Sequence, residues 1–204
     1  SNYKKIIFSN KELDNKLFEN YKNKDTYYTL KKVKSKFNQP LHNALDSLVS
    51  LTHLIFGYCF SQPLDNSLNN CTSLTHIVFG YSFNQPLNDF LSNCTSLTNL
   101  DLNHDFDQKD EIPFNIKFLF LNCNNDYYTE HLPDTIEELE LGENFNLNLD
   151  NLPSSIKKIT FCKFGIFNKE LNSLPNGLEI IKLPSEYNKQ IQNIPIWLKK
   201  LICD

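Results

Sequence analysis

Apolar residues recur along most of the chain in one fixed arrangement: an apolar residue, two variable positions, a second apolar residue, one variable position and a third. The arrangement first appears as Leu51, Leu54 and Phe56. It begins again at Leu74, Leu97, Ile116, Ile136, Ile156, Leu178 and Leu198. The last two apolar positions alternate, so both point to one face of a short extended segment. The pattern therefore predicts eight short strands, each with one apolar face and one outward face.

The spacing of these strands predicts how they are joined. Phe37, Phe60, Phe83 and Phe106 follow one another at intervals of 23 residues, and the Leu/Ile–Pro pairs of the C-terminal half follow at intervals of 20 or 22. A repeat of this length is one turn of a leucine-rich solenoid, in which stacked turns share the core that a single turn cannot form. We expect an α/β or mainly β repeat protein, a leucine-rich-repeat-like right-handed solenoid with one parallel sheet. A degenerate repeat that ends at Leu41 precedes the eight clear ones.

Two further columns of residues support the same period. Aromatic residues four positions after the strands are expected to form a second internal column, with members Phe37, Phe60, Phe83, Phe106, Phe145 and Tyr187. Small or rigid residues three positions before each leading apolar residue suit a tight corner, since proline fixes φ. These corner residues are Cys71, Cys94, Pro113, Pro133, Pro153, Pro175 and Pro195. Phe167 comes two residues late and Tyr127-Tyr128 are shifted, so we expect local bulges in these two turns.

The first 27 residues lack the repeat and are expected to cover one end of it. Ile6, Ile7 and Phe8 form a short apolar run, and residues 11–22 have the apolar spacing of a helix. A solenoid needs such a cap at an open end. The predicted organisation is a cap of one short strand and one helix over residues 1–27, followed by a solenoid of about 8–9 repeats over residues 28–204.

Outward residues on the expected concave side of the sheet are the candidate protein-binding surface. They are His53, Ile55, Tyr58, His76, Val78, Tyr81, Asp101, Phe118, Phe120, Glu138, Glu140 and Lys158. Apolar and aromatic residues placed where solvent is expected, with charges around them, are typical of protein-binding patches. The alternative is that β-branched and aromatic residues simply favour strands. Glu138 beside Lys158 is expected to be a cross-strand ion pair worth ~0.2–1 kcal/mol.

Composition and motifs argue against catalysis, cofactors and nucleic acid. The net charge of -4 gives no basic footprint, and no apolar run is long enough to span a bilayer. The motifs GxGxxG, GxxxxGK[ST], HExxH and GxSxG are absent, so no catalytic, cofactor-binding or metal-binding residue is assigned. His53 and His76 should stack as neighbours, but their column offers no third ligand for a metal. Cys71 and Cys94 are expected to pack as thiols, with a stacked disulfide as the alternative. The abundance of Asn is attributed to A/T-rich codons.

Two segments resemble a known repeat. FGYCFSQPL at 56–64 and FGYSFNQPL at 79–87 are similar to the FNIP repeat, and LPSSI at 152–156 is similar to the link between such repeats. FNIP-repeat proteins are a short leucine-rich-repeat class found chiefly in social amoebae and in giant viruses of amoebae. The resemblance covers roughly residues 28–204.

The resemblance implies a function. It implies a non-enzymatic module that binds a protein partner, as a monomer or weak homo-oligomer, in the cytoplasm (the host cytoplasm if viral). Many members carry an F-box, which implies the substrate-recognition part of an F-box-type ubiquitin ligase adaptor, although residues 1–25 lack an F-box pattern. The alternative is a structural or self-assembling viral or cell-surface repeat protein.

Overall fold

The computed structural model describes residues 4–7, 36–41, 45 and 48–203, which fall into two compact units, Ser1–Leu97 and Thr98–Asp204. The predicted cap helix over residues 11–22 lies outside the described residues, and the boundary between residues 27 and 28 stays a prediction. The two units are described in turn.

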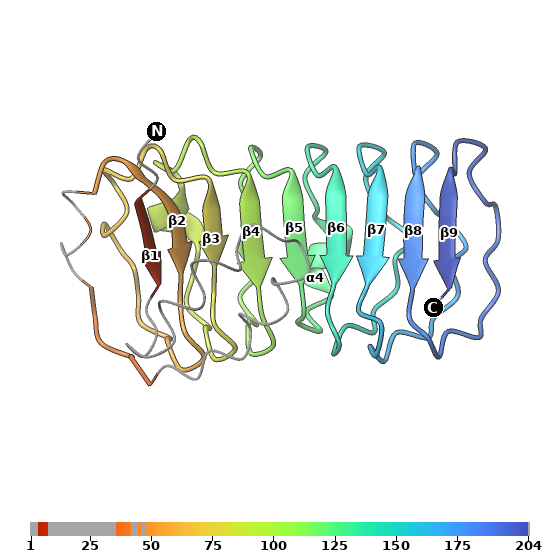
Figure 1. The fold of residues 1–204 in the computed structure, drawn as a ribbon, viewed down its shortest axis with the longest axis horizontal. Helices are drawn as coiled ribbons and strands as arrows, with labels where there is room; N and C mark the ends of the chain where they lie inside the picture. The colour runs from red at the N-terminus through yellow and green to blue at the C-terminus, as the bar shows by residue number, and fades with distance from the viewer. Residues whose placement is uncertain (1–3, 8–35, 42–44, 46–47, 204) are drawn as a thin grey trace. The chain divides into compact units, whose positions relative to one another are not determined.

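The first unit contains three parallel strands in chain order (Figure 1). They are β1 (Lys4–Ile7), β2 (Leu51–Ile55) and β3 (His76–Val78), followed by the short helix α3 (Asn88–Leu91). The register between β2 and β3 pairs residues that are 23 positions apart, such as Leu54 with Ile77. This offset equals the repeat length, so each turn of chain returns to the same column.

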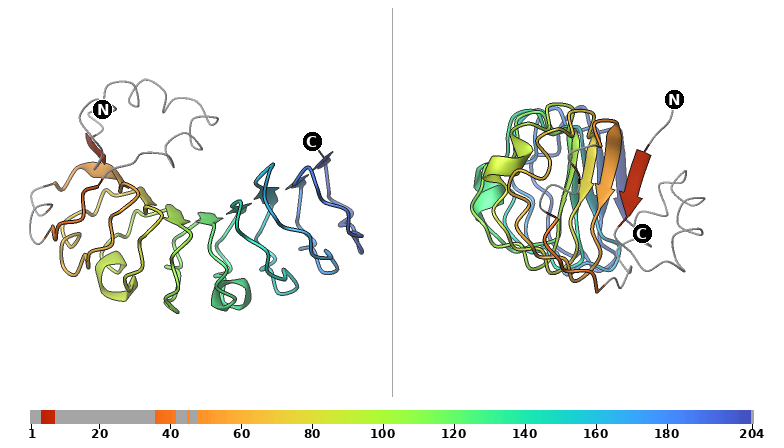
Figure 2. Two further views of the ribbon diagram at one scale, coloured as in Figure 1. Left: turned by 90° about the horizontal axis from the view of Figure 1, so that it is seen from below. Right: turned by 90° about the vertical axis from the view of Figure 1, so that its left-hand side faces the viewer.

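The second unit continues the same construction with six parallel strands (Figure 1). They are β4 (Asn99–Leu102), β5 (Phe118–Leu121), β6 (Glu138–Leu141), β7 (Lys158–Phe161), β8 (Ile180–Leu183) and β9 (Lys200–Cys203). The short helix α4 (Tyr127–Glu130) lies between β5 and β6 in the chain. In each unit the short helix lies on the side of the turn opposite to the sheet (Figure 2).

The predicted apolar columns form the core. Leading and strand residues such as Leu74 and Ile77 in the first unit, and Leu119, Leu139 and Ile159 in the second, are at most 1% exposed. Full burial of such a side chain contributes about 1.5–3 kcal/mol. The prediction of a parallel-sheet solenoid in which stacked turns share one core is therefore confirmed.

The aromatic column is also present, including in the irregular turns. Phe60 stacks between Phe37 and Phe83, with ring centroids 6.1 and 6.3 Å away. In the second unit Phe167, despite its late position in the sequence, lies 6.2 Å from Phe145 and 6.1 Å from Tyr187. The expected bulge therefore does not displace the ring from the column.

The shifted Tyr pair is accommodated in another way. Tyr128 sits in α4 and packs against Phe106, with ring centroids 5.8 Å apart. Tyr128 is fully buried and so occupies the aromatic layer of its own turn. The helical turn is how this repeat brings a shifted aromatic residue back to the core.

The corner residues close each turn with the same hydrogen bond. The carbonyl of the corner residue accepts a hydrogen bond from the amide of the leading apolar residue three positions later, at 3.0 Å for both Leu74 to Cys71 and Leu178 to Pro175. Proline suits this position because it needs only its carbonyl there. The predicted tight corner is confirmed.

Several asparagines have a structural role that codon usage does not explain. The side-chain oxygen of Asn124 accepts a hydrogen bond from the backbone amide of Asn146, Asn146 accepts from Asn168, and Asn168 accepts from Asn188, at 3.0–3.2 Å. Each bond links one turn to the next and satisfies an amide that has no strand partner. The attribution of Asn to codon bias alone was wrong at these positions.

No helix in the described part of the chain is long and apolar enough to cross a membrane.

Candidate protein-binding surface

Two rings on the outer face of the sheet, the face that points away from the core, are stacked as expected. His53 on β2 and His76 on β3 are register partners. Their ring centroids are 4.1 Å apart and their planes differ by 10°. Both side chains are partly exposed. Because equivalent positions of neighbouring turns lie in register, a ring that recurs in the repeat forms a stacked pair.

The preceding threonines fix how these imidazoles are oriented. The Nδ1 atoms of His53 and His76 lie 2.9 and 2.8 Å from the hydroxyls of Thr52 and Thr75. The Thr75 hydroxyl donates to the backbone oxygen of Thr52 at 2.9 Å, so its own proton is used and Nδ1 of His76 donates to it. Equivalent ring orientations make the Nε2 lone pairs parallel rather than convergent, which does not favour a shared metal ion. Among the described residues no group of three or more metal-ligating side chains is found.

A second ring pair lies just past the ends of the same two strands. Tyr58 and Tyr81 stack with centroids 4.8 Å apart and planes within 7°. Tyr58 is 39% exposed and Tyr81 is partly exposed. The first unit therefore presents two parallel aromatic stacks. The partly exposed Val78 on β3 lies between His76 and Tyr81 in the sequence.

Outward side chains in the second unit include charges of both signs. Lys158 donates to Glu138 at 2.8 Å across β6 and β7, so the predicted cross-strand ion pair is confirmed. Phe118 and Glu140 are both partly exposed. This surface differs in chemistry from the aromatic stacks of the first unit.

The sequence analysis missed a further row of charges at the start of these strands. Glu137 is bonded by Lys157 at 2.9 Å and by Lys117 at 3.3 Å, and Glu179 is bonded by Lys199 at 2.8 Å. Hydrogen bonds from Lys157 and then Lys117 lower the pKa of Glu137. The signal was available, because a charged residue recurs just after each leading apolar residue from Ile116 onward.

Three predicted surface residues are buried instead. Ile55 is 3% exposed, Asp101 is 1% exposed and Phe120 is fully buried. Alternation predicts exposure only where one face of a strand is open, whereas β4 and β5 are buried at three consecutive positions and so on both faces. The expectation of solvent exposure at these three positions was wrong. The strands β6, β7 and β8 keep the alternating pattern.

The cysteines lie in very different surroundings. Cys71, Cys94 and Cys123 are buried, and Cys203 is exposed. Burial raises the pKa of Cys94 to about 12 and that of Cys123 to about 11. The Sγ of Cys94 donates to the backbone oxygen of Phe90 at 3.6 Å, as suits a packed thiol.

This contrast predicts the pattern of thiol reactivity. The thiolate is the reactive species. In native protein at about pH 8, the thiol of Cys203 should therefore be the first to react with a coloured disulfide reagent. Cys94 and Cys123 should react only after denaturant is added, because a raised pKa and burial both remove accessible thiolate. Mass spectrometry of the labelled peptides checks the order. Fast labelling of Cys94 in the native protein would contradict the packing described above.

Comparison with known proteins agrees with this geometry. The FNIP Repeat family model matches residues 129–164. Among solved structures the chain is similar to CroV588, a giant-virus protein described as a novel circular LRR protein, with 30% sequence identity and a TM-score of 0.55. The match covers 74% of this chain and 26% of that chain, so the chain matches about a quarter of that relative's length. No curated protein matches the chain.

The chain is thus a repeat protein of the leucine-rich-repeat type. Within that class it carries an FNIP repeat at residues 129–164, in agreement with the resemblance noted for residues 56–64 and 79–87.

Proposed function

We propose that this chain is a non-enzymatic protein-interaction module that holds a protein partner on the outer face of its sheet. The observation that carries the proposal is the pair of aromatic stacks in the first unit, His53 on His76 and Tyr58 on Tyr81. Rings that are already held parallel lose little conformational freedom on binding, and tyrosine is enriched among the residues that dominate binding energy.

The second unit offers a separate set of contacts. Phe118 supplies a partly exposed ring, and Glu138, Glu140 and Lys158 supply charges of both signs. Such charges contribute mainly to orientation and to the choice of partner. They complement an apolar contact rather than replace it.

The family resemblance supports a more specific role, that of the substrate-recognition part of an F-box-type ubiquitin ligase adaptor in the cytoplasm. In that role the captured protein is a substrate, and ligase subunits accompany it in the complex. A structural, self-assembling role is the second candidate. The exposed side chains of Ile196 and Trp197, at the corner before β9, favour it.

Binding by the aromatic stacks makes a direct prediction. The double variant Tyr58→Ser/Tyr81→Ser should bind its partner about 10- to 100-fold more weakly, equivalent to roughly 1.4–2.7 kcal/mol. The partner is first captured from amoebal lysate with the 204-residue chain as bait, and its affinity is then measured by titration.

The matched control is Phe164→Ser, which removes a ring that is 79% exposed and lies outside the stacks. Equal affinity of the tyrosine variant and the native chain would overturn the proposed surface. A partner lost equally with both variants would place the contact elsewhere. A captured protein whose ubiquitination depends on Tyr58 and Tyr81 would support the adaptor role.

A further inference from the structure

One corner turn of the second unit contains an Asn–Gly pair. Residues 175–178 form the turn before β8, which is closed by a hydrogen bond of 3.0 Å from the amide of Leu178 to the carbonyl of Pro175. Asn176 and Gly177 occupy the two central positions of this turn. An asparagine is followed by glycine nowhere else in the chain.

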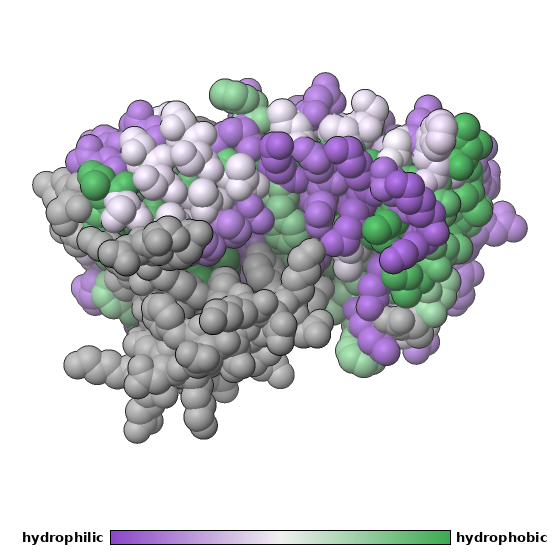
Figure 3. Space-filling view, turned by 45° about the horizontal axis from the view of Figure 1, so that its top comes forward, coloured by the Kyte–Doolittle hydropathy of each residue, from purple (hydrophilic) through white to green (hydrophobic). Residues whose placement is uncertain are grey.

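Both residues of the pair are open to water. Asn176 and Gly177 are exposed, whereas Pro175 and Leu178 on either side of them are buried. Figure 3 is turned towards the corners and shows hydrophilic side chains gathered over those of the second unit. Among the described residues, neither the carboxamide of Asn176 nor the backbone amide of Gly177 takes part in a hydrogen bond. No such bond therefore holds these two groups apart.

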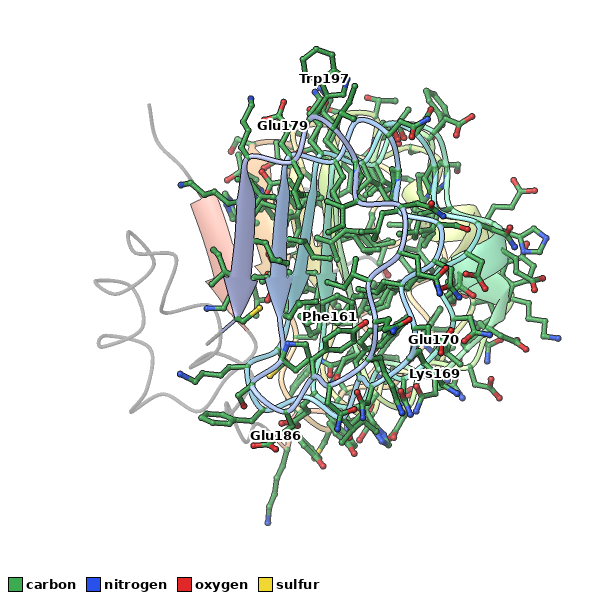
Figure 4. The ribbon with its side chains drawn as sticks, turned by 90° about the vertical axis from the view of Figure 1, so that its right-hand side faces the viewer. Phe161, Lys169, Glu170, Glu179, Glu186 and Trp197 are labelled. Atoms are coloured by element: carbon green, nitrogen blue, oxygen red, sulfur yellow. The ribbon has the colours of Figure 1, made fainter. Side chains whose placement is uncertain are left out.

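The glycine leaves this corner without a side chain. The equivalent position of other turns in the unit is occupied by Thr135, Ser155 and Trp197, and Figure 4 shows Trp197 projecting from its corner. Because glycine has no Cβ, its amide nitrogen can approach the side chain of the preceding residue with little steric hindrance. Asparagine is among the thermolabile residues, and its carboxamide carbon is the electrophile within reach of that nitrogen.

We propose that Asn176 is a self-modification site, at which the folded chain converts this asparagine to aspartate and isoaspartate without an enzyme or a cofactor. The backbone nitrogen of Gly177 attacks Cγ of Asn176 and forms an N–Cγ bond. The carboxamide C–N bond breaks, and ammonia leaves with the proton of the Gly177 amide. Water then opens the cyclic imide. The net reaction exchanges ammonia for water, so nothing is oxidised or reduced.

The bond that water breaks decides the product. Cleavage between the imide nitrogen and Cγ leaves an ordinary aspartate. Cleavage between the imide nitrogen and the backbone carbonyl carbon leaves isoaspartate, in which the main chain runs through the former side chain and is longer by one carbon. Either product adds one negative charge to the corner.

The corner tolerates the first of these products. Asp134 occupies the equivalent position of an earlier turn, where it is exposed. That corner keeps its closing hydrogen bond, 3.2 Å from the amide of Ile136 to the carbonyl of Pro133. Conversion of Asn176 to aspartate should therefore leave the fold unchanged.

The second product disturbs the turn. Leu178 is fully buried at the end of the turn, and Ile181 on β8 pairs in register with Ile159 on β7. An extra main-chain carbon lengthens the path from Pro175 to Leu178, whereas the apolar side chains fit only one register. The isoaspartyl form should therefore be less stable than the aspartyl form.

Other asparagines are followed by amides that are already bonded. The amide of Ser67, after Asn66, donates to the oxygen of Leu64 at 2.7 Å, and the amide of Phe145, after Asn144, donates to an oxygen at 3.3 Å. An amide that attacks a side chain has to give up such a bond, which raises the barrier. Asn176 should therefore react before Asn66 and Asn144.

The experiment keeps the 204-residue chain under native conditions at neutral pH and samples it over time. Peptide mass spectrometry follows the change from carboxamide to carboxylate at each asparagine, and an isoaspartyl methyltransferase with a labelled methyl donor detects isoaspartate. Asn176 should react faster than Asn66 and Asn144. Gly177→Ala should slow the reaction at Asn176 at least about tenfold, because the added Cβ crowds the attacking nitrogen.

Urea unfolding then compares the products after their separation by ion exchange. The aspartyl form and the variant Asn176→Asp should unfold with the native chain, and the isoaspartyl form should unfold at a lower urea concentration. Equal midpoints for all these forms would overturn the effect on the turn.

The site itself is tested by the rates. An Asn176 that stays intact while Asn66 and Asn144 react would overturn the proposal. A reaction that occurs only in urea, or one that Gly177→Ala leaves at the native rate, would overturn it too. None of these measurements needs a binding partner, so this proposal and the proposed function are tested separately.

Discussion

Replacing Phe167 by alanine is expected to lower the free energy of unfolding by about 3–5 kcal/mol. Phe167 is 2% exposed and contacts three rings of the aromatic layer. The centroid distances are 4.2 Å to Phe161, 6.2 Å to Phe145 and 6.1 Å to Tyr187. The variant leaves a cavity between three turns, and because repeat stability depends on contacts between neighbours, both interfaces weaken together.

Urea unfolding followed by circular dichroism measures this effect. The matched control is Ile166→Ala, at the adjacent position, where the side chain is 58% exposed and should cost within about 0.5 kcal/mol. If Phe167→Ala and Ile166→Ala lower the free energy of unfolding equally, the Phe167 ring does not make the stabilising contacts described above.

Phe167 also shows how far the sequence predicts the fold. Its position two residues out of phase correctly marked an irregular turn. The return of the ring to the column depends on the intervening loop, in which the amide of Gly165 bonds to the oxygen of Cys162 and the amide of Ile166 bonds to Glu143. Those bonds are local geometry that a hydrophobic period does not encode.

The regular part of the fold was predictable because burial of the apolar side chains requires one strand register. Leu139 and Ile159 lie in register 20 residues apart, and a shift by one residue would move every apolar side chain to the wrong face. The same logic predicts that His53 stacks on His76, and the structure confirms the stack. Periodicity therefore fixes which residues share a column.

The outer face was harder, because a strand pattern does not say what covers each face. Asp101 and Phe120 follow the outward alternation yet are at most 1% exposed. Trp197 is the opposite case. It is large and apolar where the earlier turns have Asn115, Thr135, Ser155 and Gly177, yet it is 66% exposed. The outer face was therefore predicted less well than the core.

Replacing Gly80 by alanine is expected to cost about 3 kcal/mol or more, at the upper end for overpacked sites. An added Cβ would lie 1.9 Å from the backbone oxygen of Gly57 in the neighbouring turn. The obstacle is backbone, so it cannot move aside as a flexible side chain can. The two turns would have to separate.

Gly177→Ala is the matched control, because Gly177 is exposed and its nearest atom, the oxygen of Ser154, lies 3.3 Å from an added Cβ. That variant should change stability by less than about 1 kcal/mol, partly because alanine restricts the unfolded chain. Thermal or urea unfolding compares the two.

The Gly80 variant also connects the fold to the binding surface. Tyr58 and Tyr81 follow Gly57 and Gly80 directly in the chain, and their rings stack at 4.8 Å only while the two turns keep this spacing. Any Gly80→Ala protein that folds should therefore bind the partner more weakly than Gly177→Ala does. Unchanged stability and unchanged binding would together show that the close contact between Gly57 and Gly80 does not set the geometry of the stack.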